Sequence, residues 1–487
     1  MKVLFIIPRN KSLLGHKYTP PGHPHIGIAY LGAFLKERGH IVKVYDDGLQ
    51  NTSSLESSIR EFEPGLIGIT SFSYCYDYAI DCVRRVKEGF DLPVVMGGPH
   101  VSVAKGDVFQ DSPLDYAIKK EGEYPLFELI EALAKKKSDL SDVNNLIWKK
   151  DGRIVENPDM SFITNLDEIP FPDYGLFDVK KYVSTTIHST ALVTSRGCPY
   201  LCTYCSTLLS MGRNFRKRSA ENVFAEIRQR YDEGYRDFDI NDDCFSLDIA
   251  RALKICELII ESGLNIRFKC YNGLRVDRIT LDLLKKMKKA GFYFFAYGCE
   301  SGNQEVLKNI KKSITLDQVQ NAVRWARDAG IDCCVNFIIG HPTETYGQAL
   351  DTLNFAKSLD CNYVNFSNLI PYPGTEAYDW ALANATFLVD TKNYLRNLST
   401  YDDAPIFETT EFTKEQREKV TRLGHDYYYK RILIWRLGSA LGNLVYFFTK
   451  IPGLRNIASN FAINNKFGRL IFIFLSGRLT KKSEIKA

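Results

Sequence analysis

Three closely spaced cysteines constrain this 487-residue chain more than any other feature. Cys198, Cys202 and Cys205 stand in C-x3-C-x2-C spacing, directly after an apolar, strand-like run that begins at Ala191. One loop can therefore present three thiolates to one inorganic centre. Thiolates suit iron–sulfur clusters, and three of them on a four-iron cube leave one iron open for chemistry. Zinc or three unrelated core cysteines are weaker alternatives, because a structural zinc site needs four ligands and no second ligand block follows nearby.

The motif, with Tyr204 just before its third cysteine, resembles the signature of the radical S-adenosylmethionine (SAM) enzymes. In that family the open iron chelates SAM, and reduction of the cluster cleaves SAM to a 5′-deoxyadenosyl radical. The resemblance implies that Cys198, Cys202 and Cys205 are the catalytic and metal-binding residues and that Tyr204 lies at the cofactor. It also implies a [4Fe–4S] cluster, SAM and an external electron donor of the flavodoxin or ferredoxin type.

Length and cysteine usage indicate the broad class. A chain of this length should hold two or three domains, and its 45% hydrophobic content is ordinary for a globular protein. Twelve cysteines do not indicate a disulfide framework, because the N-terminal apolar run is short and ends at Pro8. We expect a cytoplasmic protein.

Residues 1–146 alternate between short apolar runs and segments with helical spacing. We expect strands at residues 3–7, 41–45, 66–71, 94–96 and 116–118. We expect helices at residues 26–38, 54–62, 76–88 and 124–136. The alternation predicts a parallel, doubly wound, Rossmann-like sheet with helices on both faces. Ligands bind such sheets beyond the carboxyl ends of the strands, where this chain carries Pro20-Pro21-Gly22 and several further glycines and acids.

Turn chemistry alone would also explain these strand-end residues. However, PPGHPHIGIAYLGAFLKERGH, VVMGGPHVS and KKEGEYPLFELIEAL, in this order, resemble the cobalamin-binding domain that precedes many radical SAM domains. The resemblance implies cobalamin as a further cofactor. The residues that it places at cobalamin are Ser71, Ser73, Tyr76, Gly97, Gly98, His100, Glu121, Gly122 and Glu123.

One departure from other cobalamin proteins concerns the cobalt ligand. The D-x-H-x-x-G signature, whose histidine binds cobalt from below, is absent from residues 1–146. We therefore expect no histidine ligand, and the loop Ser71–Tyr76 is the candidate for the lower face of the corrin. His100 is then a residue of the pocket wall or an ordinary half-buried histidine.

Residues 147–190 are expected to form a linker between domains. The Asp151-Gly152 pair predicts a two-residue hairpin near its start. Prolines at 158, 170 and 172 and little periodicity indicate an irregular segment after the hairpin.

Residues 191–390 contain six strand–helix repeats, which fit the partial (β/α)6 barrel that the radical SAM resemblance implies. We expect strands near residues 192–195, 236–241, 266–271, 293–298, 333–339 and 363–369. We expect helices at residues 219–233, 248–262, 280–290, 315–329 and 344–358. In such barrels the chemistry lies at the carboxyl ends of the strands.

Polar residues follow several of these strands. The resemblance implies that DDCF contacts the amino group of SAM, that GCESG contacts the ribose and that NFIIGHPTET lies beside the adenine. The residues so implied are Asp242, Asp243, Glu300, Ser301, Ile339 and Gly340. The acids could instead be residues at helix N-termini.

The run Arg216–Arg218 either pairs with a carboxylate of SAM or substrate or is a solvated charge run. Of the cysteines outside the motif, Cys244 and Cys299 are the candidates for contact with substrate.

The composition and spacing of residues 391–487 predict a helical, basic C-terminal region. From Arg431 onward ten Lys/Arg face one acid, a charge of +9, whereas the whole chain carries +5. No apolar run is long enough to span a bilayer. Basic and bulky apolar residues at helical spacing fit either a helix at a membrane surface or a cover for the open side of the barrel. No recognition motif supports a nucleic-acid partner.

The leading hypothesis is an anaerobic cobalamin-dependent radical SAM methyltransferase. Its radical would abstract hydrogen from an unactivated carbon of a small or lipid-like substrate, and methylcobalamin would supply the methyl group. SAM would act twice, as radical source and as the methyl donor to cobalamin. The alternatives are a cyclase or rearrangement enzyme of the anaerobic tetrapyrrole-cyclase type and, from another class, a cobalamin- or redox-sensing binding protein. The cytoplasmic enzyme could contact the inner face of the cell membrane.

Overall fold

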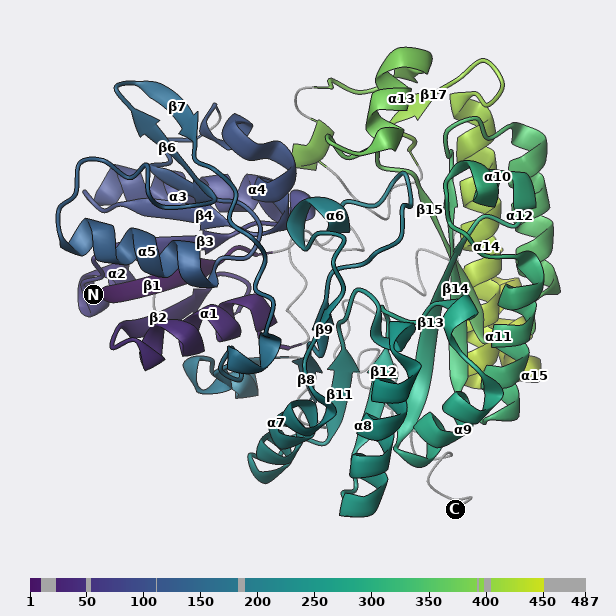
Figure 1. Cartoon of the computed structure of the whole chain (residues 1–487). Coiled ribbons are helices and arrows are strands. Elements are labelled where there is room, and N and C mark those ends of the chain that lie inside the picture. Colours follow the sequence, from purple (N-terminus) through teal and green to yellow (C-terminus); the bar gives the residue numbers. More distant parts are fainter. Residues whose placement is uncertain are drawn as a thin grey trace.

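The computed structural model describes residues 1–9, 23–49, 54–110, 112–182, 189–391, 394–397 and 404–450. The predicted ligand loop Pro20–Gly22 and the tail beyond Lys450 lie outside these residues. Two large sheets stand beside each other, the first built by the N-terminal part of the chain and the second by its middle (Figure 1).

The first sheet has seven strands in the order β2-β1-β3-β4-β5-β6-β7. Its parallel strands are β1 (Lys2–Ile7), β2 (Ile41–Asp46), β3 (Leu66–Thr70), β4 (Val94–Gly97) and β5 (Tyr116–Ile118). Its long helices are α1 (Ile26–Glu37), α2 (Leu55–Phe62), α3 (Tyr76–Gly89) and α5 (Glu123–Ala134). The short helix α4 (Pro99–Ala104) forms where the sequence predicted only a strand-end loop.

Helices cover both faces of this sheet because alternate residues of its strands point to opposite sides. Phe5 belongs to the same core as Ile28 of α1, whereas Ile6 packs in a second core with Ile59 of α2. The doubly wound, Rossmann-like prediction is confirmed.

The predicted hairpin is part of the first sheet rather than of a linker. Its strands are β6 (Leu146–Lys150) and β7 (Arg153–Glu156), and β6 pairs antiparallel with β5. The physical reason lies in Leu146 and Ile147, which are buried in the cores on opposite faces of the sheet. The sheet therefore continues past residue 146, where the sequence placed the end of the domain.

The second sheet has six parallel strands in the order β15-β14-β13-β12-β11-β8. The strands are β8 (Ser189–Leu192), β11 (Asp237–Ile240), β12 (Arg267–Cys270), β13 (Phe292–Glu300), β14 (Asp332–Ile339) and β15 (Tyr363–Asn368). The helices are α7 (Ala220–Asp232), α8 (Ile249–Ser262), α9 (Leu281–Lys289), α10 (Gln304–Asn309), α11 (Leu316–Asp328) and α12 (Tyr346–Ser358). Since β8 and β15 are the unpaired ends of this order, the sheet is an open, partial barrel, as predicted.

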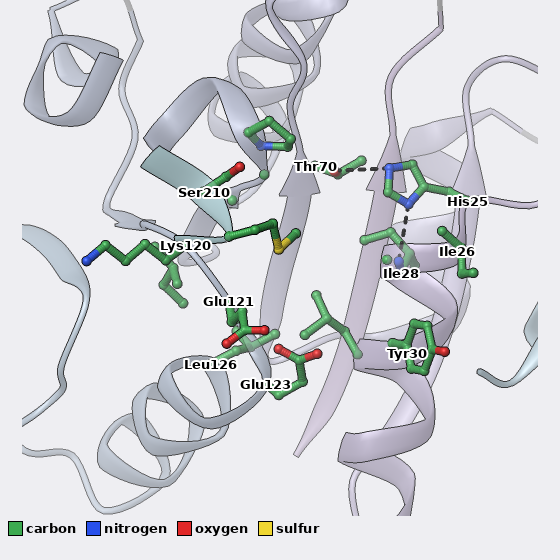
Figure 2. A pocket seen from close by; sticks show the side chains of 18 of the residues that line it. His25, Ile26, Ile28, Tyr30, Thr70, Lys120, Glu121, Glu123, Leu126 and Ser210 are labelled. Carbon is green, nitrogen blue, oxygen red and sulfur yellow. Dashed lines mark hydrogen bonds between the residues drawn. The ribbon is translucent and has the colours of Figure 1, made fainter. Parts of the chain in front are cut away.

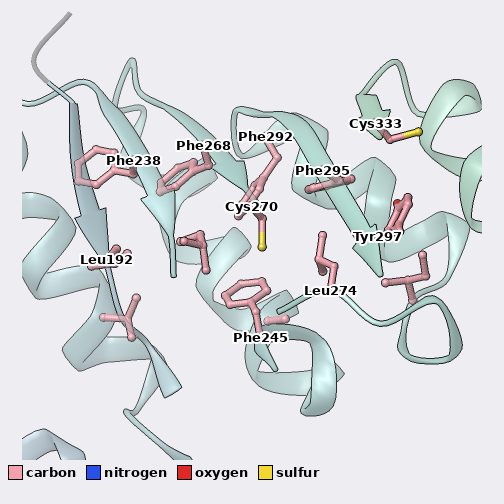
Figure 3. Close-up of a cluster of buried hydrophobic side chains, with 14 of the residues drawn as sticks. Leu192, Phe238, Phe245, Phe268, Cys270, Leu274, Phe292, Phe295, Tyr297 and Cys333 are labelled. Carbon is pink, nitrogen blue, oxygen red and sulfur yellow. The ribbon is translucent and has the colours of Figure 1, made fainter. Parts of the chain in front are cut away.

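A column of aromatic rings packs the strands against the outer helices (Figure 3). Phe238 stacks on Phe268 with ring centres 5.2 Å apart, and Phe268 stacks on Phe292 at 4.8 Å. Burying three large side chains on neighbouring strands fixes the strand ends above them, and these ends carry the candidate site.

The C-terminal region covers the β15 side of the barrel. It comprises α13 (Glu376–Asn384), the two-residue strands β16 (Thr386–Phe387) and β17 (Phe407–Glu408), α14 (Lys414–Leu437) and α15 (Ser439–Thr449). Helix α14 packs against β15 and α12, and α15 runs along α14 (Figure 1). The predicted barrel cover is thus present in α14. No helix among the described residues is long and apolar enough to cross a bilayer.

Candidate active site

The cysteine loop leaves the barrel after β8 and the short strand β9 (Ser195–Arg196) and is fixed before its first thiol. Gly197 has φ +83°, and a Cβ there would lie 2.3 Å from the carbonyl oxygen of Asn214, so only glycine fits. The N–H of Gly197 donates to Asp243 at 2.8 Å. The N–H of Cys198 donates to the carbonyl of Gly212 at 3.2 Å.

The far side of the loop is anchored to the other strand ends. Thr203 donates through its N–H to the carbonyl of Ile310, and its own carbonyl accepts from the N–H of Ala377. The guanidinium of Arg275 lies 3.3 Å from the ring centre of Tyr200. The loop is therefore held in place by segments that follow β12, β13 and β15.

The three motif thiols differ from the other nine in exposure. Cys198, Cys202 and Cys205 are half-buried, whereas the remaining nine cysteines are buried. A hydrogen bond from the thiol of Cys244 lowers the pKa of Cys198, and burial raises the pKa of Cys205. Accessible thiols on one anchored loop fit an iron–sulfur cluster.

No three His, Cys, Asp or Glu side chains of the described residues are grouped closely enough to hold a single metal ion. The thiolates of a four-iron cube each bind a different iron. Among the two candidate substrate cysteines, Cys244 contacts Cys198 and Cys299 donates to the carbonyl of Ser301 at 3.1 Å.

The two acids after β11 have different surroundings. Asp242 is buried and accepts from the N–H of Thr194 at 2.6 Å and from the hydroxyls of Thr194 and Ser195 at 2.5 and 2.6 Å. Its carboxylate ties β8 to β11. Asp243 lines a cavity of about 390 Å³, and burial raises its pKa to about 6. Of the pair, Asp243 is the one placed to meet a ligand.

Glu300 ends β13 in a left-handed conformation with φ +75°, which is strained for a residue other than glycine. Its carboxylate accepts from the ammonium of Lys312 at 2.8 Å, and the same ammonium lies 3.4 Å from the hydroxyl of Tyr204. Burial alone would lower the pKa of Lys312, but Glu300 holds it above the ordinary value. Lys312, which the sequence analysis missed, thus joins the cysteine loop to the predicted ribose acid.

The other predicted SAM residues lie around these groups. Ser301 is buried and shares a hydrogen bond with Thr352 at 3.1 Å, so its hydroxyl serves the fold. Ile339 and Gly340 end β14, where the N–H of Gly340 donates to Glu344 at 2.6 Å. Burial raises the pKa of Glu344 to about 7.

A cavity of about 390 Å³ lies between the first sheet and the barrel (Figure 2). Its lining combines residues from both parts of the chain, among them the predicted Gly97, Gly98, Glu121, Gly122 and Glu123 and, from the barrel, Ser195, Arg196, Asn241 and Asp243. Its apolar lining includes Phe5, Ile28, Ile69, Val95, Ile118 and Leu126. A second cavity of about 310 Å³ shares His25, Thr70, Phe72 and Asn241 with it. Glycines beside apolar side chains permit the close approach of a large ligand such as cobalamin.

Buried ion pairs join the two sheets at this cavity. Arg196 donates to Glu121 and to Glu123, each at 2.8 Å, and Arg216 donates to Glu121 at 2.7 Å. All four side chains are at most 10% exposed. The predicted cobalamin acids Glu121 and Glu123 therefore line the cavity while holding the barrel against α5.

The same contacts correct the interpretation of Arg216–Arg218. Arg216 is paired with Glu121, and Arg218 is buried against Glu226. Only Lys217 is exposed, paired with Asp248. Neither arginine is a solvated surface charge or available to a ligand, because each is already neutralised inside the protein.

His25, which the sequence analysis also missed, lies at the wall of both cavities (Figure 2). Its Nδ1 accepts from the N–H of Ile28 at 3.2 Å, so Nε2 carries the proton that is shared with the hydroxyl of Thr70 at 3.4 Å. Burial lowers the pKa of His25 to about 4, and the ring is neutral at pH 7. Its signal in the sequence was its place directly before the first helix.

Four residues predicted at cobalamin pack against one another and are outside the lining of both cavities: Ser71, Ser73, Tyr76 and His100. Ser73 and His100 share a hydrogen bond at 3.0 Å, and the ring centre of Tyr76 lies 3.9 Å from that of His100. The carbonyl of Ser71 accepts from the N–H of His100, and all four residues are buried. From the candidate lower-face loop Ser71–Tyr76, Phe72 lines both cavities, and Tyr74 and Cys75 line the second.

Comparison with known proteins agrees with this arrangement. Residues 192–356 match the radical SAM superfamily, and residues 14–130 match the B12 binding domain. An uncharacterized methyltransferase of Pyrococcus horikoshii, PH0819, is 34% identical over 438 residues, which span 88% of this chain and 93% of the relative. The chain belongs to the cobalamin-dependent radical SAM methyltransferase family. Members of this family use a [4Fe–4S] cluster, SAM and cobalamin, and so does this chain.

The chain is also similar to more distant proteins. The hopanoid C-3 methylase of Methylococcus capsulatus is 25% identical over 72% of this chain and 68% of its own length. An anaerobic magnesium-protoporphyrin IX monomethyl ester cyclase of Rubrivivax gelatinosus is 27% identical over 78% of this chain and 69% of its own length. The structure of the radical SAM methyltransferase TsrM from Kitasatospora setae has the same fold, with a TM-score of 0.65, 20% identity and coverage of 77% and 73%.

Proposed function

We propose that this family member transfers a methyl group to an unactivated carbon of a small or lipid-like substrate. The observation that carries the proposal is the cavity lined by both parts of the chain, with Gly97 and Gly98 from the first sheet and Asp243 from the barrel. Cobalamin supplies the methyl group when bound, and SAM with the cluster supplies the radical. A shared cavity would let both act on one substrate.

The residues of the chain would orient these groups. Cys198, Cys202 and Cys205 would hold the cluster, and Asp243 would face the sulfonium or amino group of SAM. Glu300 would accept from the ribose hydroxyls, with Lys312 keeping its carboxylate in place. These roles are supported by the positions of the side chains at the carboxyl ends of neighbouring strands.

The substrate class is inferred from the C-terminal surface. Helix α15 exposes Leu441, Leu444, Phe447 and Phe448, which are 47–63% accessible. The sequence adds a net charge of +9 from Arg431 onward. Apolar and basic groups together favour contact with anionic lipid, at about 1 kcal/mol per basic residue near the surface. The hopanoid methylase relative acts on a lipid by its name, which agrees with a lipid-like substrate met at the membrane surface.

The test is an anaerobic incubation of reconstituted protein with methyl-labelled SAM, cobalamin and a lipid extract. A flavodoxin or ferredoxin, which we propose as the natural electron donor, is compared with a chemical reductant. Label in a lipid product supports the proposal. Label confined to water-soluble products would refute the lipid-like class. Formation of 5′-deoxyadenosine without label in any product would support a cyclase-type reaction instead.

A further inference from the structure

A buried arginine of the C-terminal helix reaches the end of β14. Arg417 lies in the first turn of α14 and is 2% exposed. Its Nε donates to the carbonyl of Phe412 at 2.9 Å, and its Nη1 donates to the carbonyl of Gly340 at 3.2 Å. The guanidinium also lies 4.5 Å from the ring centre of Phe407 and 4.7 Å from that of Phe412. The side chain thus joins the C-terminal region to the barrel.

Stability alone does not explain Arg417. Among the described residues no carboxylate lies within ion-pair distance of it, and its buried Nη2 has no hydrogen-bond partner there. Burial lowers its pKa to about 10, against the opposing charges of Glu344 and Glu408. A buried charge without an ion-pair partner disfavours folding. A role for the guanidinium at Gly340 is therefore the simpler explanation for an arginine at this buried position.

The peptide groups at Gly340 are held from both sides. The N–H of Gly340 is bound by Glu344 at 2.6 Å and its carbonyl by Arg417. Gly340 has φ +92°, and a Cβ there would lie 2.0 Å from Nη1 of Arg417. The preceding carbonyl, of Ile339, accepts from the N–H of Leu369 at 2.8 Å. These hydrogen bonds therefore hold the backbone of Ile339 and Gly340 in a single orientation. Of the residues that hold it, Arg417 is the one that comes from outside the barrel.

We propose that Arg417 is a positioning residue for the adenine-binding backbone of Ile339 and Gly340, so that α14 completes the SAM site. The inference rests on the proposed function and on the family resemblance, which implies that this strip lies beside the adenine of SAM. Backbone N–H and C=O groups recognise a base only when their directions are fixed, because a rotated peptide group presents neither at the required place. Loss of Arg417 would free the carbonyl of Gly340 while leaving the cysteine loop intact.

The experiment measures Kd values for SAM, 5′-deoxyadenosine and methionine with anaerobically reconstituted full-length protein. 5′-Deoxyadenosine carries the adenine without the chelating groups, and methionine carries the chelating groups without the adenine. Arg417→Met is expected to weaken binding of SAM and 5′-deoxyadenosine about tenfold. Methionine binding, followed through the EPR spectrum of the reduced cluster, is expected to stay unchanged.

Two further variants keep the test decisive. Arg422→Met, an exposed change on the same helix, should leave all three Kd values unchanged. Arg417→Lys keeps a donor for the carbonyl of Gly340, so its loss should be smaller and confined to the two adenine ligands. Equal weakening of all three ligands, or no weakening in either Arg417 variant, would overturn the inference. Failure of the wild-type protein to bind SAM would refute the proposed function itself.

Discussion

At the scale of single residues, two adjacent acids have opposite tasks. Asp242 accepts three hydrogen bonds at the end of β8, whereas Asp243 borders the cavity. Asp242→Asn would replace one carboxylate oxygen by an NH2 group that faces the hydrogen-bond donors of Thr194 and Ser195. We therefore expect a loss of about 3 kcal/mol in the free energy of unfolding. Asp243→Asn should change stability little but weaken SAM binding. Urea denaturation and equilibrium dialysis check both, and the reverse pattern would show that Asp242 is the ligand residue.

The hydrogen bonds of His25 and His100 near the cavity bear on whether a histidine binds cobalt. Both nitrogens of His25 are engaged, with Ile28 and Thr70, and His100 is bonded to Ser73. We therefore expect no histidine ligand, and the EPR spectrum of the cob(II)alamin form should lack nitrogen superhyperfine splitting. The matched variants are His25→Ala and His100→Ala. A splitting that disappears in either variant would identify that residue as the lower ligand of cobalt.

At the scale of elements, α14 covers the barrel, and α15 carries the exposed apolar surface for which we propose membrane contact. Trp435 of α14 packs on Tyr363 and Phe294 of the barrel, whereas α15 exposes Leu444 and Phe447. A chain ending after Gly438 keeps α14 whole. We expect it to retain the cluster and the SAM affinity of the full-length protein but to lose flotation with anionic liposomes.

The double variant Leu444→Glu with Phe447→Glu in the full-length chain tests the same surface without removing the basic tail. It should reduce flotation in proportion to the lost apolar contact, while SAM binding stays unchanged. Absence of flotation by the full-length protein at low salt would remove the support for a lipid-like substrate. Flotation that survives the truncation would place the lipid contact elsewhere.

At the scale of the whole molecule, the sequence predicted what depends on local patterns. The strands of both sheets follow from apolar runs such as Val3–Ile7, and the cysteine loop follows from its spacing. The contacts that assemble the site were not predictable in this way. Arg196 and Glu121 are 75 positions apart, and their attraction leaves no periodic trace in either segment. Arg417 and Gly340 are 77 positions apart and are joined through a backbone carbonyl, which any residue type possesses.

The ion pairs between the sheets lead to a prediction about the molecule as a unit. Arg196→Met would leave the buried carboxylates of Glu121 and Glu123 short of a partner, which costs about 3–5 kcal/mol. We expect the midpoint of thermal unfolding to fall, with one transition retained, because one continuous apolar core includes residues of both the first sheet and the barrel. Lys217→Met, on the neighbouring strand in an exposed pair, should leave the midpoint unchanged.

A measurement on the cobalamin-bound protein can distinguish two effects of these ion pairs, the positioning of the two sheets and a general contribution to stability. Arg196→Met with Glu123→Gln removes one charge of each sign, so it should recover much of the stability while the contact between β9 and α5 stays weak. If the network sets the distance between the sheets, this double variant should still bind cobalamin and assemble its cluster. The magnetic interaction between cob(II)alamin and the reduced cluster, measured by pulsed EPR, should nevertheless become weaker and more widely distributed than in the wild type. An unchanged interaction in a variant with restored stability would mean that the two sheets are positioned by their apolar contacts, and that the ion pairs only compensate the burial of their own charges.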